Sequence, residues 1–579
     1  MECETSTSFP NALLNGLNDL AFTANGDVTN ANTQDACVDF FFGVKEMTSA
    51  SRINELVAAA WKQSPIDTLK LIFYLLDVRD GKSCNKEAIT ALLWLFKEDQ
   101  NTFILNLKQV GTFGCYRDLM NLLVQSKMTE LQQADLKEKD LKNAMDKKKN
   151  RKGERHVMFK TMFDTVRAHK TNDITRLQDV LIGEICRVLQ EDKRKLENGD
   201  QISLLSKWIP SPGSRIDRMT GLNGLIAQHL LITINPDISK RKLNRASERF
   251  RKEYMTPLRK HLQIVETKMS AGEWDAIDYK QVPSQSMTRN RKSFDKHDKE
   301  KFGTYLKEAA EGKVAIKIKG GLKPHQITHL MRYETTGVAL AEAQWNAYLS
   351  DLNEKGSLTN AMAICDVSGS MTSVQVGNGC TALDVSVSLG LLLASVTKAP
   401  WGNHLITFSG DPRFHKIQGN TLEEKARFIE VMPWDMNTNF DKVFDLILAT
   451  AKRRTVPQED MIKTLFVFSD MEFDAAGGKS FGQTALERIR QKYVEAGYEM
   501  PQLIFWNLGS GSHAPATVND AGIGLVSGFS GNMLNLFLDN DLLSDEGSKE
   551  PKLTPREVMR KAIDNERYNV LQLAGDCDR

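Results

Sequence analysis

The sequence contains no hydrophobic run that approaches the roughly 18 apolar residues of a membrane-spanning helix. Its 579 residues are 41% hydrophobic and 26% charged, which excludes the compositions of disordered and collagen-like chains. At roughly 100–200 residues per domain, the length predicts roughly three to five compact units. The composition therefore predicts a soluble, globular protein of several domains.

Cysteine is scarce and badly spaced for a shared structural role. The 8 cysteines include no C-x-x-C pair, so the spacing supports neither a zinc cage nor a disulfide framework. The first residues, MECETSTSFPNALL, lack the basic and long apolar regions of a signal peptide. Reduced thiols and this N-terminus favour a reducing compartment, so we expect the protein in the cytoplasm.

The chain as a whole has almost no excess of one charge, but each of its two halves does. The formal net charge is +2, yet residues 1–350 hold 54 Lys and Arg against 44 Asp and Glu, while residues 351–579 hold 22 against 30. This asymmetry predicts that the basic half meets a polyanion and that the acidic half holds a cation or an uncharged partner.

Apolar residues recur at helical spacing from about Arg52 to Leu349, as in ASRINELVAAAWKQ and KEAITALLWLFKED. Ser64 is placed to cap a helix that starts at Pro65. Helical pairs of this size bury their apolar stripes by stacking, which predicts an α-helical solenoid over 41–350. We interpret a highly charged segment at about 132–170 as a solvated helix or surface insertion, and residues 1–40 as partly irregular.

After Leu349, short apolar runs alternate with helical stretches. This alternation predicts βαβ units and a doubly wound α/β domain at 355–545, followed by a C-terminal helix and tail at 546–579. Thr421 with Glu424, and Thr554 with Glu557, have the spacing of capping boxes that start two of the helices.

Oxygen-bearing side chains follow two of the predicted strands. Asp366, Ser368 and Ser370 come directly after the run AMAIC, and Asp470 follows LFVFS. Thr438 lies in a loop between these strands. Ligands of such sheets collect at the carboxyl ends of the strands, and hydroxyl and carboxylate oxygens suit hard divalent cations. We expect these five residues to bind Mg²⁺, with Mn²⁺ or Ca²⁺ as alternatives.

This constellation resembles the von Willebrand factor A domain and its metal-ion-dependent adhesion site. The D-x-S-x-S motif of that family falls on Asp366, Ser368 and Ser370, its loop threonine on Thr438, and its later aspartate on Asp470. The resemblance implies that the serines and the threonine contact the ion directly, and that a carboxylate of a protein partner completes its coordination.

Segments over residues 40–545, among them TFGCYRDLMNLL, KWIPSPGSRIDRMTGL and LVSGFSGNM, resemble the domain-of-unknown-function family found in plants, fungi and giant viruses. That family joins a helical module similar to the TROVE domain of Ro ribonucleoproteins to a C-terminal von Willebrand A domain. The resemblance implies a HEAT-like or TROVE-like solenoid that binds single-stranded or structured small RNA, as part of a ribonucleoprotein.

Two basic segments are the candidates for RNA contact. A proline-rich loop is flanked by cations, and a basic stretch from Lys240 to Lys260 has apolar residues at helical spacing, so one face can pack while the other binds phosphates. The same stretch could equally be a solvated face. The predicted RNA-binding residues are Lys207, Arg215, Arg218, Lys240, Arg241, Lys242, Arg245, Arg249, Arg251 and Lys252.

Signatures of an enzyme are missing from the sequence. The stretch GGKS follows a strand, but Phe473 stands where a phosphate loop needs its first glycine, and the stretch DGKS fails in the same way. The pair His325 and His329 lacks the glutamate of a zinc-protease helix. We therefore expect a non-catalytic, Ro-like RNA-binding scaffold whose A domain binds a cation and a partner. The alternative is a metal-dependent protein-interaction adaptor that binds no nucleic acid.

Overall fold

The computed structural model describes residues 20–23, 25, 27–133, 163–234, 245–318, 322–333, 337–377, 379–408, 412–430, 440–473, 484–509, 513–538, 543 and 553–575. These residues belong to two compact units. The sheet unit comprises Met1–Glu87 and Asp278–Val570, and the helical unit comprises Ala88–Ile277 and Leu571–Arg579. The predicted order, a mostly helical N-terminal part followed by an α/β sheet, is confirmed. The units differ from the predicted division near residue 350, because helices from both ends of the expected solenoid group with the sheet.

A six-stranded sheet lies at the centre of the sheet unit, with the strand order β10-β9-β8-β3-β6-β7. Neighbouring strands are parallel, except that β7 is antiparallel to β6 at one edge. The runs AMAIC and LFVFS, which were predicted as strands, form β3 and β8, whereas the antiparallel edge strand β7 was not predicted. The strands are β3 (Ala361–Asp366), β6 (His404–Phe408), β7 (Arg413–Lys416), β8 (Thr464–Ser469), β9 (Gln502–Asn507) and β10 (Ile523–Ser527).

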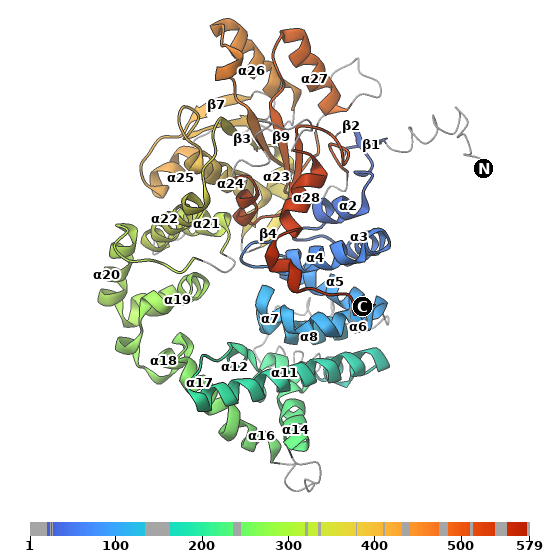
Figure 1. Ribbon diagram of the computed structural model, residues 1–579. Coiled ribbons are helices and arrows are strands. Elements are labelled where there is room, and N and C mark those ends of the chain that lie inside the picture. The colour runs from blue at the N-terminus through green and yellow to red at the C-terminus, as the bar shows by residue number, and fades with distance from the viewer. Residues whose placement is uncertain are drawn as a thin grey trace, which may run out of the picture. The chain divides into compact units, whose positions relative to one another are not determined.

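Alternate residues of the central strand β3 pack on opposite faces of the sheet. Met362 and Ile364 join the apolar core that includes α26 (Asp441–Arg454) and α27 (Ala485–Ala496), two helices that run side by side in Figure 1. The other face of β3 packs against α24 (Ala382–Val396), where the glycine at 390 leaves room for Cys365. A sheet covered on both faces explains why its parallel strands are apolar throughout.

The remaining helices of the sheet unit come from both ends of the predicted solenoid and from the α/β region. They are α2 (Ala36–Gly43), α3 (Ala50–Gln63), α4 (Pro65–Leu76), α19 (Ser284–His297), α20 (Lys299–Ala310), α21 (Pro324–Tyr333), α22 (Val338–Lys355), α23 (Gly369–Ser373), α25 (Leu422–Glu430) and α28 (Pro555–Ile563). Two small antiparallel pairs are β1 (Leu20–Phe22) with β2 (Val28–Asn30) and β4 (Gln375–Gly377) with β5 (Cys380–Thr381). Short 3-10 turns are η4 (Tyr279–Gln281), η6 (Gln458–Asp460), η7 (Gly531–Leu536) and η8 (Glu566–Val570).

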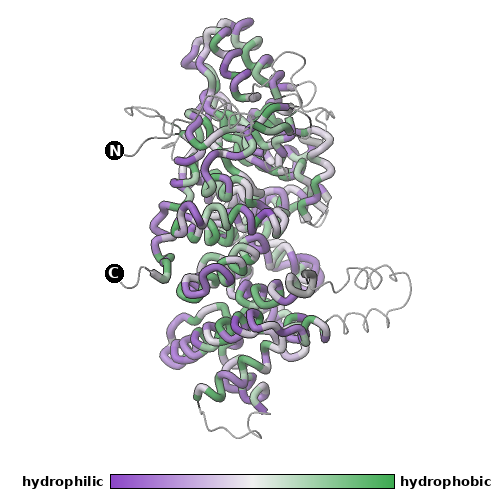
Figure 2. Tube along the Cα trace, turned by 90° about the vertical axis from the view of Figure 1, so that its right-hand side faces the viewer, coloured by the Kyte–Doolittle hydropathy of each residue, from purple (hydrophilic) through white to green (hydrophobic). Residues whose placement is uncertain are grey.

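The helical unit contains α-helices and short turns, and no strand among its described residues. Its longest helix, α11 (Asn172–Asn198), starts at a Thr171 cap and ends at Gly199 in the left-handed conformation. Figure 2 shows hydrophilic and hydrophobic residues alternating along its helices, as expected for amphipathic helices. The others are α5 (Asn85–Glu98, which begins at the unit boundary), α6 (Gln100–Asn106), η1 (Leu107–Gln109), α7 (Val110–Phe113), α8 (Arg117–Gln133), α12 (Leu205–Trp208), α13 (Arg215–Thr220), α14 (Leu222–Ile234), α16 (Ala246–Phe250), the π-helix η2 (Arg251–Met255), α17 (Thr256–Leu262), α18 (Val265–Ala271) and η3 (Trp274–Ala276).

The predicted helix starts are confirmed. Ser64 accepts a hydrogen bond from the backbone N–H of Asp67, and Pro65 is the first residue of α4. Thr421 and Glu424 form both bonds of the capping box at α25, and Thr554 caps α28. Most of the charged segment at 132–170 lies outside the described residues. No described helix is both long enough and apolar enough to cross a membrane.

Candidate functional site

The first strand of the α/β region, β3, is flanked by β6 on one side and β8 on the other. The chain therefore leaves β3 in one direction across the sheet and later returns to its opposite side. Such a reversal of strand order is the switch point of the sheet. It opens a crevice at the carboxyl ends of the two central strands, where ligands of open α/β sheets bind. In this protein the crevice lies where Asp366 ends β3 and Asp470 follows β8.

The D-x-S-x-S residues form a compact, buried loop. Asp366 is fully buried, and its Oδ1 accepts a hydrogen bond of 2.9 Å from the backbone N–H of Ser368. The Ser368 and Ser370 hydroxyls lie 3.0 Å apart. This turn, followed at once by α23, directs three side-chain oxygens of alternating residues to one place.

Asp470 belongs to the same cluster, although it is 104 residues further along the chain than Asp366. Its side chain is 3% exposed, and it accepts hydrogen bonds from the Ser370 hydroxyl and from the backbone N–H of Glu472. Ser469, the last residue of β8, donates a 2.6 Å hydrogen bond to Oδ2 of Asp366. Ser469 was not among the predicted ligands, although its position beside Asp470, at the end of a strand paired with β3, was a signal in the sequence.

Both carboxyl groups have a raised proton affinity. Burial raises the pKa of Asp366 to about 7, the carboxylate of Asp470 adds to this effect, and the hydrogen bonds from Ser368 and Ser469 oppose it. Burial also raises the pKa of Asp470, against the hydrogen bond from Ser370. Two buried acids without a neighbouring cation are electrostatically unfavourable, so a divalent cation would stabilise their ionised forms.

Four of the five predicted metal ligands are therefore brought together, while Thr438 lies outside the described residues. Within the part of the chain that is described, no three His, Cys, Asp or Glu residues gather so that they could hold a metal ion. A donor set of two carboxylates and two hydroxyls has the chemistry of a hard-cation site with neutral oxygens, and its two negative charges would balance those of one divalent ion.

Some of the predicted RNA-binding side chains are held by acids of the same unit. Each of these pairs neutralises a cation that the sequence left open for phosphate. The Lys207 ammonium also lies 5.4 Å from the ring centre of Trp208, a half-buried aromatic that the Arg117 guanidinium approaches at 5.8 Å. The pairs are Lys207 with Glu266 at 3.2 Å, Arg249 with Glu253 at 2.6 Å and Lys252 with Glu248 at 3.3 Å.

A second group of predicted RNA-binding residues is exposed and makes no ion pair with any described residue. Its members are Arg215 and Arg218 on α13, Arg245 before α16, and Arg251 at the start of η2. Lys240, Arg241 and Lys242 lie outside the described residues. Residues 88–277 hold 34 Lys and Arg against 24 Asp and Glu, so the helical unit carries the positive excess of the chain.

One cation of the basic stretch has a structural role that the sequence analysis did not assign. Arg259 donates to the backbone oxygens of Ser206 and Ile209 at 2.9 and 2.7 Å, and so fixes the start of the proline-rich loop. Tyr254 and Tyr279, two aromatic residues near the basic segments, are buried. Their rings therefore pack inside the protein and are not placed to stack on RNA bases.

Two of the three enzyme-like motifs lie among the described residues of the sheet unit, and the GGKS stretch lies outside the described residues. The buried Lys82 of the DGKS stretch donates to the backbone oxygens of Phe41 and Val44 and to the Ser527 hydroxyl. His325 is buried with its ring edge-on to Phe529. These contacts hold α2 and β10 to the turn after α4, and they pack α21 onto the sheet unit.

Fold and site together define a class: a two-unit protein that joins a basic helical unit to a parallel-sheet unit with an acidic, hydroxyl-rich switch point. Residues 23–358 match the family described as Domain of unknown function (DUF2828), and residues 360–568 match Domain of unknown function (DUF7788). The first match covers more than half of the chain, and the protein belongs to the DUF2828 family.

Two proteins are similar to this chain. Uncharacterized protein L728 of Acanthamoeba polyphaga mimivirus is 27% identical over 580 residues, which cover 96% of this chain and 91% of that protein. The predicted kinship with a giant-virus protein is thus confirmed. The crystal structure of the Ro (RSR) protein of Deinococcus radiodurans matches with a TM-score of 0.39 and 12% identity, over 91% of this chain and 99% of that one.

Proposed function

We propose that the sheet unit binds one divalent cation, Mg²⁺ in the first place, at a site of the von Willebrand A type. Asp366, Ser368, Ser370 and Asp470 would hold the ion, together with Thr438. The observation that carries this proposal is the approach of two buried carboxyl groups whose pKa values are both raised and whose remaining neighbours are hydroxyls. The ion would supply positive charge and an open coordination position for an acidic group of a partner.

The site has the features of binding rather than of catalysis. The hydroxyl of Ser368 interacts with Ser370, and the backbone N–H of Ser368 is bound by Asp366. A nucleophilic serine is usually activated by a neighbouring histidine, and the described partners of Ser368 include no histidine. We therefore propose a non-catalytic, metal-dependent recognition site.

Thermal unfolding with and without the ion tests the metal proposal. Saturating Mg²⁺ at about 100 times its dissociation constant would stabilise the protein by about 2.7 kcal/mol. Asp366→Asn and Asp470→Asn should remove this stabilisation. The matched control is Asp445→Asn, which changes an exposed carboxylate on α26 that pairs with Lys492. Equal stabilisation of all four proteins by Mg²⁺ would contradict the proposal.

For the helical unit we propose RNA binding through its exposed arginines. The support is the net positive charge of residues 88–277 and the four arginines that no described acid neutralises. Each phosphate contact to single-stranded RNA contributes about −0.7 to the slope of log affinity against log salt concentration. Arg215→Ala combined with Arg218→Ala should weaken binding to a single-stranded RNA and reduce the steepness of that slope by about 1.4.

Fluorescence anisotropy at 50–200 mM salt provides this measurement, with Arg453→Ala as the control. Arg453 is an exposed arginine of the last turn of α26, in the sheet unit. The adaptor alternative is favoured by the three cations already paired with acids, which reduce the surface available to phosphates. Absence of RNA binding at 50 mM salt would select the adaptor.

A further inference from the structure

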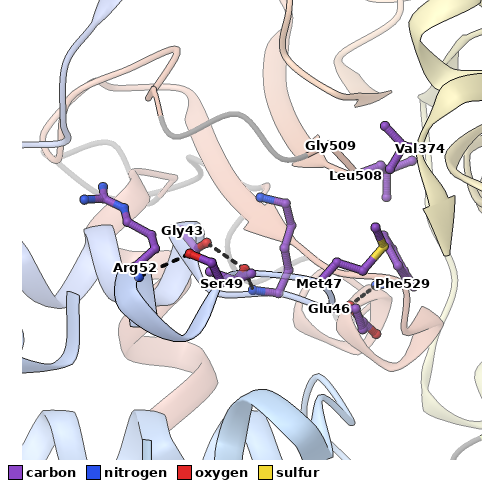
Figure 3. Close-up of a pocket in the computed structure, with 11 residues that line it drawn as sticks. Gly43, Glu46, Met47, Ser49, Arg52, Val374, Leu508, Gly509 and Phe529 are labelled. Carbon is purple, nitrogen blue, oxygen red and sulfur yellow. Dashed lines mark hydrogen bonds between the residues drawn. The ribbon is translucent and has the colours of Figure 1, made fainter. Parts of the chain in front are cut away.

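A cavity of about 200 Å³ lies within the sheet unit, at the edge of the sheet that carries the candidate metal site. One wall is the loop from Lys45 to Ser49, which joins α2 to α3. Figure 3 shows Ser49 and Arg52 on one side, with Val374, Leu508 and Gly509 across from them. We call this cavity the Lys45 pocket.

The Lys45 pocket adjoins the candidate metal site but shares none of its ligands. Gly509 packs so closely on Asp470 that a Cβ at position 509 would lie 2.2 Å from the Cβ of Asp470. Val374 directly follows α23, the helix that begins after Ser368. A ligand in the pocket would therefore lie beside the switch point of the sheet.

The loop that forms the wall is fixed by its own hydrogen bonds. Thr48 Oγ1 accepts from the backbone N–H of Lys45 at 3.1 Å, and the N–H of Thr48 returns a bond to the Lys45 oxygen at 3.1 Å. The N–H of Met47, a residue with φ of +72°, donates to Oε1 of Glu87 at 3.0 Å. The pocket thus has a preformed wall.

Lys45 is the unusual member of this wall. It is 3% exposed, and its ammonium group makes no hydrogen bond or ion pair with any residue that the structure describes. Glu46, the acid with the largest electrostatic effect on Lys45, already pairs with Lys323 and accepts from the backbone N–H of Phe529. Burial raises the pKa of Cys84, so this nearby thiol stays neutral.

Further positive charge surrounds the cavity. The 14-residue helix α3 begins there at Ser49, with no acidic side chain in its first turn. Its N-terminus contributes backbone N–H groups and the positive end of the helix dipole. Arg52 also lines the pocket, and its only described acidic partner is the largely exposed Glu55.

Comparison with Lys82 shows that this fold can satisfy a buried lysine. Lys82 is equally buried, but three oxygen atoms surround its ammonium group. Lys45 has no such acceptors and lines an open cavity instead. Burial of an unpaired cation is unfavourable. A buried lysine that lines a cavity is therefore expected to gain its counter-ion from a ligand that binds in that cavity.

We propose that the Lys45 pocket binds the oxyanion group of a small ligand, a phosphate or a carboxylate. Lys45 supplies the charge, the N-terminus of α3 supplies hydrogen-bond donors, and Met47, Val374 and Phe529 give apolar contact to the rest of the ligand. At about 30 Å³ for each water in the liquid, the cavity has room for about six waters, enough for one such group.

The full-length protein, titrated with inorganic phosphate or with acetate in the presence of EDTA, tests this proposal. Sodium chloride at the same ionic strength is the reference. Thermal unfolding and calorimetry should show that one of the two anions binds and raises the unfolding temperature; the anion that binds more tightly identifies the group. No shift with either anion at tens of millimolar would overturn the proposal.

Two substitutions make the test specific. Lys45→Met should fold, unfold at a temperature no lower than the unsubstituted protein, and bind the anion at least tenfold more weakly. Lys62→Met, at the exposed far end of α3, should bind it normally. Failure of Lys45→Met to fold would show that Lys45 has a structural partner and would overturn the proposal, as would unchanged anion binding.

Two more measurements need no change at Lys45. Burial lowers the pKa of Lys45 to about 8, with Arg52 acting in the same direction and Glu46 against it. Anion binding should therefore weaken as the pH rises from 7 to 9, and a pH-independent affinity would contradict the role of Lys45. Asp366→Asn should retain anion binding, which separates this proposal from the metal proposal.

Discussion

The hydroxyl of Ser469 lies 2.6 Å from Oδ2 of Asp366 and joins the ends of two neighbouring parallel strands. The same Ser469 oxygen accepts from the backbone N–H of Met471 at 3.1 Å, so its proton is directed toward the carboxylate. Asp366 is thereby held by a hydroxyl on one oxygen and by a backbone N–H on the other. The carboxylate that ends β3 is fixed in orientation before any ligand arrives.

Ser469→Ala should weaken divalent-cation binding by about 10–100-fold, the usual effect of losing a group that orients a metal ligand. The fold should persist, because only one hydroxyl is removed. Calorimetric titration with Mg²⁺ measures the change. Ser395→Ala on α24, whose hydroxyl bonds to the Leu391 oxygen, is the control. Equal affinities of the two variants would show that Ser469 does not orient Asp366.

Asp27→Asn should destabilise the sheet unit by about 3 kcal/mol. Arg488, 8% exposed, pairs with Asp27 at 2.7 Å and with Asp441 at 2.9 Å, and removal of one partner from a buried network leaves charge uncompensated. Urea unfolding measures the effect. Arg427→Ala breaks the exposed pair with Glu423 and should cost less than about 1 kcal/mol. Similar losses in both variants would contradict the importance of burial.

Lys82→Met should cost about 3 kcal/mol or more, because it leaves two backbone oxygens and the Ser527 hydroxyl without their donor. Lys45→Met should cost nothing by the same measurement, although both lysines are buried. Chemical denaturation of the two variants in parallel distinguishes a lysine that stabilises the fold from a lysine that binds a ligand. A reversed order of stabilities would refute this assignment.

The stability difference between Lys45→Met and the unsubstituted protein should depend on pH. The folded pKa of Lys45, about 8, lies below its unfolded value of about 10.4, so the unfolded chain binds more protons between these values. The cost of the charged, buried lysine is therefore present in full below pH 8 and is relieved as the pH rises. Lys45→Met should be the more stable protein at pH 7, and its advantage should shrink toward pH 10.

Local features of this fold were readable from the sequence because neighbouring residues determine them. The Ser64 and Thr421 caps depend on side chains within three residues, and AMAICD is recognisable as a buried strand because every position is apolar up to Asp366. The order of strands along the chain then indicated that Asp366 and Asp470 would share one edge.

Features that depend on distant parts of the chain were not readable. Asn30 bridges to Ala514 and Asp27 pairs with Arg488, so part of the segment expected to be partly irregular belongs to the sheet unit. Helical periodicity shows that one face of a helix is buried, but it does not show which element that face packs against. For this reason the predicted domain division near residue 350 differs from the boundaries of the two compact units. The Lys45 pocket combines residues more than 300 positions apart, and no spacing in the sequence reveals it.

Direct measurement of ion uptake tests the central claim most directly. Calorimetric titration of metal-free protein with Mg²⁺, repeated with Mn²⁺, should give one ion per chain for the unsubstituted protein and for Asp445→Asn. Asp366→Asn and Asp470→Asn, each verified as folded by circular dichroism, should bind neither ion at that site. Undiminished uptake of one ion by both of these variants would show that the buried carboxyl pair at the switch point is not a metal centre.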